Sequence, residues 1–128
     1  MSDQLEQDKN NATAFYDLTF NQNRPAKAIE GYAGDEYIQP NPAVADGEQA
    51  FIGSFERVGR DYPGTRVEFK RSVAEGNYVV LHGHQVWPGD HEYAGIDTFR
   101  FDDLGQVVEH RDVLQIVPEV SENDTTML

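Results

Sequence analysis

The sequence predicts an α+β domain in which about three helices come first and a curved antiparallel sheet follows. Apolar residues recur at helical spacing in the first half of the chain, and they alternate with polar residues in the second half. Short turn sequences rich in glycine, proline, asparagine and aspartate separate the alternating segments. A strongly curved sheet that wraps around helices leaves a pocket on its concave face.

Three segments of the first half are predicted to be helical. Residues 5–20 place their apolar side chains on one face of an amphipathic helix. Pro25 suits the first turn of a second, short helix that runs to about residue 33, where Gly34 closes it. A third helix follows positions 46–47 and ends at the Tyr-Pro-Gly sequence of positions 62–64.

The strands are predicted from period-two alternation and from the turns between them. A short strand over 36–39 precedes the rigid Pro-Asn-Pro stretch of positions 40–42. Four longer strands follow, over residues 65–74, 78–87, 92–101 and 106–117. We take residues 1–118 as a single domain and residues 119–128, which are polar and lack periodicity, as a C-terminal tail.

The composition limits the classes of function. The chain of 128 residues contains no cysteine, so disulfides, thiolate nucleophiles and thiolate metal ligands are excluded. Its formal net charge of -13 makes nucleic acids and anionic membranes poor partners. Such a composition suits either a high-salt organism or an ordinary acidic protein. No apolar run is long enough to cross a membrane and the N-terminal segment is acidic, so we expect a cytoplasmic protein.

The last predicted strand places two ionisable side chains in an apolar stripe. His110 and Asp112 share a face with Val108, Leu114 and Ile116. A carboxylate among apolar neighbours loses hydration and holds a proton more tightly, and a histidine beside it can hold or relay that proton. This arrangement is typical of general acid–base chemistry in a pocket.

Two other strands repeat this pattern. Asp97 interrupts an aromatic stripe in the strand over 92–101, and His82 and His84 share a face with two valines in the strand over 78–87. We therefore expect one polar cluster, shared by three strands, in a cavity. The structural alternatives are an arginine partner for Asp97, an orienting role for Asp112, a backbone carbonyl partner for His110 and a wet strand end for the other two histidines.

A metal site is a further alternative. His82, His84, His110 and Asp112 have the ligand types of a zinc or iron site, although their spacing is not diagnostic. We expect neither a metal nor another cofactor.

Three segments of the chain resemble one protein family. They are Tyr-Ile-Gln-Pro-Asn-Pro at 37–42, Gly-Ile-Asp-Thr-Phe-Arg-Phe at 95–101 and Val-Glu-His-Arg-Asp-Val-Leu-Gln at 108–115. With the order of elements, they resemble the SnoaL-like polyketide cyclase family of the nuclear transport factor 2 superfamily. The resemblance implies a cone-shaped α+β barrel with a deep pocket, and usually a homodimer. Relatives include polyketide cyclases, ketosteroid isomerase and limonene epoxide hydrolase, which perform cofactor-free acid–base chemistry on apolar small molecules.

The resemblance also implies roles for individual residues. Asp112 matches the carboxylate that acts as acid or base in the cyclases, and His110 matches the histidine that precedes it by two positions. Asp97 falls on the strand where the cyclases place another polar pocket residue. Gln39 and Asn41 match polar positions that help to hold the water in epoxide hydrolases.

The chain departs from the family pattern at several positions. His82 and His84 fall where epoxide hydrolases have an arginine and an aspartate, which argues against epoxide hydrolysis by the same groups. Pro40 replaces a histidine that is frequent in SnoaL-like proteins, and Arg111 replaces a tryptophan. These departures weaken the transfer of any one specific activity.

The predicted function is acid–base catalysis on a small apolar carbonyl compound, of the cyclase or isomerase type. Asp112, oriented by His110, would move a proton at the carbon next to the carbonyl, while a protonated Asp97 or His82 would donate a hydrogen bond to the oxyanion. The expected substrate-binding residues are Gln39, Asn41, His82, His84, Tyr16, Phe55 and Phe99. Further candidates for the apolar wall are Tyr32, Phe51, Trp87 and Ile116.

Two other functions stay open on the sequence. In a hydrolase or dehydratase, Asp112 would activate a water held by Asn41. In a non-catalytic module, the pocket would bind a small apolar molecule or the domain would serve dimerisation. Substitution of Asp112 distinguishes these functions, because it removes turnover from an enzyme and changes ligand binding little in a binding module.

Overall fold

The computed structural model describes residues 2–38, 48–123 and 126–128. The helical elements are α1 (Ser2–Tyr16), the π-helical turn η1 (Asp17–Asn21), α2 (Pro25–Tyr32) and α3 (Glu48–Asp61). The strands are β1 (Ala33–Ile38), β2 (Arg66–Glu75), β3 (Tyr78–Val86), β4 (Glu92–Phe101) and β5 (Val107–Ile116). These bounds agree with the predicted ones to within a few residues, and none of these helices is long and apolar enough to span a membrane.

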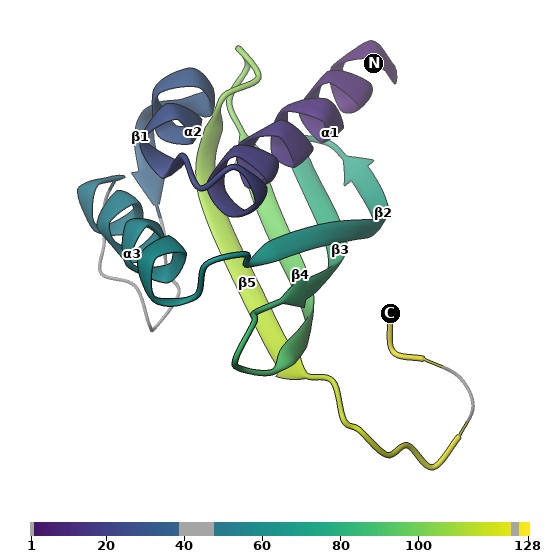
Figure 1. The fold of residues 1–128 in the computed structure, drawn as a ribbon. Coiled ribbons are helices and arrows are strands. Elements are labelled where there is room, and N and C mark those ends of the chain that lie inside the picture. Colours follow the sequence, from purple (N-terminus) through teal and green to yellow (C-terminus); the bar gives the residue numbers. More distant parts are fainter. Residues whose placement is uncertain (1, 39–47, 124–125) are drawn as a thin grey trace.

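The strands form one sheet in the order β1-β5-β4-β3-β2. The pairs β2–β3, β3–β4 and β4–β5 are antiparallel, as adjacent strands joined by short turns must be. Among the described strands only β1 pairs in parallel, with β5, so the sheet is mixed and not antiparallel throughout as predicted. The helices cover one face of this curled sheet (Figure 1), and the predicted α+β class is confirmed.

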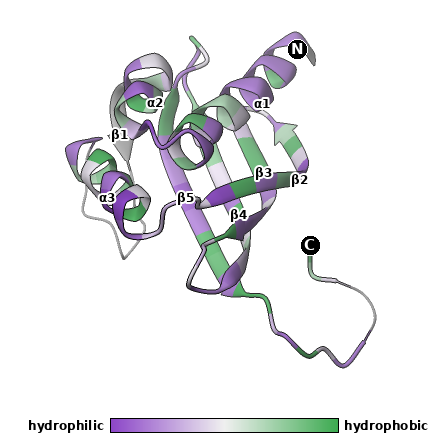
Figure 2. Cartoon of the chain, viewed as in Figure 1, coloured by the Kyte–Doolittle hydropathy of each residue, from purple (hydrophilic) through white to green (hydrophobic). Residues whose placement is uncertain are grey.

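The core lies between the helices and the inner face of the sheet. Bands of hydrophobic and hydrophilic colour alternate along the strands (Figure 2), as expected when one face is buried. The ring of Phe15 on α1 lies 5.5 Å from that of Phe51 on α3 and 6.0 Å from that of Phe99 on β4. These separations are typical of favourable aromatic pairs, so the three rings join both layers.

The end of the first helix is tied to the sheet. The chain continues from α1 into η1, and the Thr19 hydroxyl donates a hydrogen bond of 2.9 Å to the carbonyl of Phe15. The Asn21 side chain accepts from the amide of Val67 on β2 at 2.8 Å and donates to its carbonyl at 3.2 Å. These two bonds join the end of η1, which directly follows Tyr16 at the end of α1, to β2.

Gly34 has a different role from the predicted one. The helix α2 ends at Tyr32, and Gly34 lies within β1. A Cβ atom at Gly34 would lie 3.0 Å from side-chain atoms of both Asp102 and Val108. Close packing of β1 on β5, rather than a left-handed helix cap, therefore explains the glycine.

Candidate active site

A buried acid–base pair joins the two central strands. Asp97 on β4 and His110 on β5 are each about 1% exposed, and His110 Nε2 lies 2.9 Å from Asp97 Oδ1. The His110 ring stacks on Phe99 with a centroid distance of 4.5 Å and an interplanar angle of 9°. The imidazole is therefore held by a ring on one side and by a carboxylate at one nitrogen.

The strand register explains why these groups meet. Asp97 lies opposite Asp112, and Phe99 lies opposite His110. Residues that face each other across an antiparallel pair share a face of the sheet, so all four side chains point toward the helices. Two carboxylates directly opposite each other are unfavourable for a sheet, which is typical of a site kept for function.

A chain of hydrogen bonds reaches Asp97 from the other side. The indole nitrogen of Trp87 donates to the Gln85 carbonyl oxygen at 3.1 Å, and the Gln85 amide nitrogen donates to the Tyr16 hydroxyl oxygen at 3.1 Å. The Tyr16 hydroxyl in turn donates to the Asp97 carboxylate. Burial first, and then the negative charges of Asp97 and Asp112, raise the pKa of Tyr16 well above its ordinary value.

A cavity of about 270 Å³ opens beside this network. One wall comes from η1 and α3, and the other comes from β3 and β5. Five apolar side chains line it, namely Phe20, Phe55, Val58, Trp87 and Leu114. Asp112 and Gln85 are among its polar lining residues, whereas Asp97 and His110 are not. The cavity is slightly smaller than common ligand pockets of roughly 300–1,000 Å³, and it suits a small apolar molecule.

The predicted wall residues divide between cavity and core. Phe55 and Trp87 line the cavity. Tyr16, Phe51 and Phe99 are buried in the core, and Tyr32 packs against the core from α2. Ile116 is exposed near the end of β5. Gln39, Pro40 and Asn41 lie outside the described residues.

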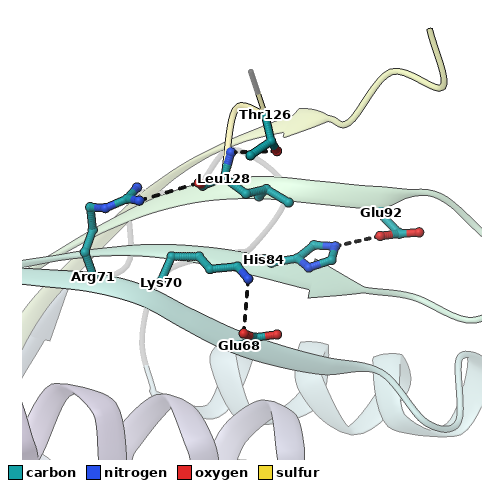
Figure 3. Close-up of polar contacts among 7 residues, drawn as sticks. All are labelled: Glu68, Lys70, Arg71, His84, Glu92, Thr126 and Leu128. Carbon is teal, nitrogen blue, oxygen red and sulfur yellow. Dashed lines mark hydrogen bonds and ion pairs between the residues drawn. The ribbon is translucent and has the colours of Figure 1, made fainter. Parts of the chain in front are cut away.

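His82 and His84 lie on the outer face of the sheet. Leu81 is the residue opposite Asp97, so His82, one position further, points away from it and lies opposite Ile96. His82 contacts Arg71 and, at 3.1 Å, the carbonyl oxygen of Met127. His84 Nε2 lies 2.6 Å from Glu92 Oε1 (Figure 3). Contrary to the expectation of one cluster shared by three strands, these histidines are separate from Asp97 and His110.

The metal alternative loses its ligand set for the same reason. His82 and His84 lie on one face of the sheet, while His110 and Asp112 lie on the other. Among the described residues, no group of three histidine, cysteine, aspartate or glutamate side chains is placed to hold a metal ion.

Gln85 is a site residue that the sequence patterns do not single out. It is about 1% exposed and comes from β3, where Val79, Leu81 and Gly83 are also buried. The sequence does contain a hint of its role, because Gln85 is a polar residue in this otherwise apolar row of the strand. Val80 and Val86 lie in the other row, which was predicted to face inward. Because both rows contain apolar residues, the alternation alone does not show which row is buried.

Solved structures of several proteins share this fold. AclR of Streptomyces galilaeus, a proposed hydroxylase, is 17% identical with a TM-score of 0.71, covering 87% of this chain and 90% of that one. A proposed isomerase of the SnoaL-like family from Agrobacterium tumefaciens is 17% identical, with a TM-score of 0.71 and coverage of 86% and 98%. IdmH of Streptomyces antibioticus, a proposed polyketide cyclase, is 13% identical, with a TM-score of 0.70 and coverage of 85% and 92%. At these identities the likeness establishes the fold alone.

Sequence comparison identifies the family. No curated protein sequence matches the chain. The family model described as the SnoaL-like domain matches residues 12–110, well over half of the chain. The matched segment includes Tyr16, Gln85, Asp97 and His110, and it stops two residues before Asp112. This match shows that the chain belongs to the SnoaL-like family.

Proposed function

We propose that this protein is a cofactor-free acid–base enzyme that transfers a proton on a small apolar carbonyl compound, in a reaction of the cyclase or isomerase type. One observation supports the proposal above the others. Asp112 lines an apolar cavity and lies directly opposite Asp97, a buried carboxylate that accepts hydrogen bonds within the fold. The names of the structural relatives, which include a proposed cyclase and a proposed isomerase, agree with this reaction class.

Asp112 is the proton-transferring group in this proposal. Its carboxylate takes a proton from the carbon next to the substrate carbonyl, and the carbon–hydrogen bonding pair becomes the enolate. In an isomerisation, the protonated Asp112 returns the proton to another carbon of the same molecule. In an aldol cyclisation, the enolate carbon attacks a second carbonyl, and the proton of Asp112 goes to the resulting alkoxide.

Asp97 is the buried member of the facing pair of carboxylates. Tyr16 donates to the Asp97 carboxylate, and His110 Nε2 lies 2.9 Å from Asp97 Oδ1. Of the two facing carboxylates, Asp112 is the one that lines the cavity, so it is the one placed to meet a substrate. Asp97 is therefore a positioning residue in this proposal, in place of its predicted role as the donor to the oxyanion.

Deuterium exchange tests the proposal without knowledge of the natural substrate. Small apolar ketones such as 2-tetralone and acetophenone are incubated with the protein in D₂O, and loss of the protons next to the carbonyl is followed by NMR. We expect the wild type to accelerate exchange of at least one ketone over buffer. Asp112→Asn should lose this acceleration by roughly 10²–10⁴-fold.

Asp61 provides the matched control. It is another carboxylate that lines the same cavity, but it is exposed on the last turn of α3. Asp61→Asn should exchange at nearly the wild-type rate. The proposal fails if exchange in the wild type does not exceed that in buffer, or if Asp112→Asn and Asp61→Asn behave alike.

Ligand binding distinguishes the non-catalytic alternative. Trp87 is the only tryptophan in the chain and it lines the cavity, so its fluorescence reports occupancy. A ketone that changes this fluorescence but does not exchange would indicate a binding module instead of an enzyme.

A further inference from the structure

We propose that Gln85 is a catalytic residue that donates an amide N–H to the substrate carbonyl oxygen and to the enolate oxygen formed from it. The inference rests on the proposed function, since it assigns the second half of the same reaction. Asp112 moves the proton, and Gln85 stabilises the negative charge that appears on oxygen. Three observations support this role.

The first observation is position. Gln85 is about 1% exposed to solvent, yet it lines the same cavity as Asp112. A Cβ atom built on Gly95 would lie 2.9 Å from Leu114 Cδ2, 3.5 Å from Gln85 Nε2 and 3.6 Å from Asp97 Oδ2. The amide nitrogen and the Asp97 carboxylate therefore lie close to the same glycine of the inner face, beside Leu114, which also lines the cavity.

The second observation is orientation. An indole nitrogen can only donate, so the hydrogen bond from Trp87 identifies the Gln85 atom that it contacts as the carbonyl oxygen. The other end of the side chain is then the amide nitrogen, which donates to Tyr16. The direction of the amide follows from its partners, and the group that remains for a ligand is a donor.

The third observation is an N–H group left over. The amide nitrogen has two hydrogens, and Tyr16 accepts one of them. No described residue accepts the second. A buried donor without a partner is destabilising, and a carbonyl oxygen in the cavity would accept its hydrogen bond. The site thus binds an oxygen acceptor better than a purely apolar molecule.

This arrangement also changes the predicted division of roles. From the sequence, a protonated Asp97 or His82 was expected to donate the hydrogen bond to the oxyanion. Asp97 accepts hydrogen bonds and is not among the residues that line the cavity, and His82 faces the other side of the sheet. Gln85 is the donor that we assign to the cavity in place of these two residues.

Infrared spectroscopy of a bound ketone tests the inference directly. The probe is 2-tetralone labelled with ¹³C at its carbonyl, measured by difference spectroscopy in excess protein. A hydrogen bond lowers the carbonyl stretching frequency, so the frequency should be lower in the wild type than in Gln85→Leu. Exchange of the probe in D₂O should fall by roughly 10²–10³-fold in the same variant.

Two further variants complete the design. Gln85→Glu keeps an acceptor for Trp87 and removes the N–H donors, so it should also raise the carbonyl stretching frequency. This variant tests the inference if Gln85→Leu fails to fold. Gln115→Leu is the matched control, because Gln115 lies on β5 and faces outward, opposite Ala94. It should leave both frequency and exchange unchanged.

The outcomes separate this inference from the proposed function. An equal frequency in the wild type and in the two Gln85 variants, with ketone bound in each, overturns the inference even where exchange depends on Asp112. If the carbonyl stretching frequency depends on Gln85 but the wild type does not accelerate proton exchange, then Gln85 is the carbonyl donor and the proposed proton transfer is wrong. Failure of the wild type to bind the ketone contradicts both.

Discussion

Asp97 and Asp112 are both aspartates, but they have different surroundings in the fold. They lie opposite each other, but Asp97 is buried against Tyr16 and His110, while Asp112 lines the cavity. Like charges directly opposite in a sheet are destabilising by roughly 0.2–1 kcal/mol, so Asp112→Asn should raise the free energy of unfolding by about that amount. Asp97→Asn should lower it by about 2–3 kcal/mol, because two buried partners lose a charged acceptor.

Urea unfolding of the two variants and the wild type measures these changes. If the carboxylate of Asp112 serves catalysis and not stability, then Asp112→Asn should be more stable than the wild type but inactive. A loss of stability in Asp112→Asn as large as that in Asp97→Asn would show that Asp112 is structural.

Tyr16 is expected to make the stability of the protein depend on pH in the alkaline range. Its pKa in the folded protein is raised well above the ordinary value, first by burial and then by Asp97 and Asp112. The resulting stability is fully present below the unfolded pKa of about 10, and it is lost as the pH rises toward the folded value. We expect the free energy of unfolding of the wild type to fall above about pH 10 more steeply than that of Tyr16→Phe. Parallel curves for the two proteins would contradict this account.

At the scale of the elements, β4 and β5 are also held together on the outer face. Glu109 Oε1 lies 3.1 Å from Arg100 Nε, and Glu109 Oε2 lies 2.5 Å from Arg111 Nε. The hydrogen bond from Arg111, and after it that from Arg100, lowers the pKa of Glu109 against the opposing effect of burial. The stability that results is present above the ordinary glutamate pKa of about 4.3, and it is lost as the pH falls through the lower folded value.

Glu109→Gln should therefore lose about 1 kcal/mol or less at neutral pH, and it should show a weaker loss of stability in acid than the wild type. The measurement is urea unfolding between neutral pH and about pH 4. Glu56→Gln is the control, because Glu56 is an exposed residue of α3. An acid profile of Glu109→Gln identical to that of the control would mean that the bridge contributes nothing.

The elements also show how far sequence patterns determine the site. Period-two alternation with clear turns is enough to locate β4 and β5 and to place Asp97, His110 and Asp112 on one face of the sheet. The same pattern fails in β3, where both rows contain apolar residues, because only contact with the helices selects the inner row. That contact excludes His82 and His84 from the cluster and includes Gln85. The hydrogen bonds of Tyr16 also depend on tertiary structure, since α1 and β4 are far apart in sequence.

At the scale of the whole molecule, the outer face of the sheet has an apolar region. Ile96 and Val113 lie opposite each other on β4 and β5 and are 43% and 73% exposed. We expect a homodimer, and we propose this exposed apolar pair as the contact between its two copies. Light scattering should give a dimer for the wild type and a monomer for Val113→Lys.

Leu104→Lys is the control for this experiment. Leu104 is 78% exposed but lies in the turn between β4 and β5, away from the sheet face, so this variant should remain dimeric. A wild type that stays monomeric over the accessible concentration range would contradict the predicted dimer and leave the cavity and its chemistry unchanged.

Proton transfer by Asp112 is the central claim, and the exchange of 2-tetralone protons in D₂O tests it most directly. The account predicts faster exchange with the wild type than in buffer, a rate near the wild-type value for Asp61→Asn and a rate near that of buffer for Asp112→Asn. Exchange that persists in Asp112→Asn, in a folded protein with the ketone bound, would contradict it.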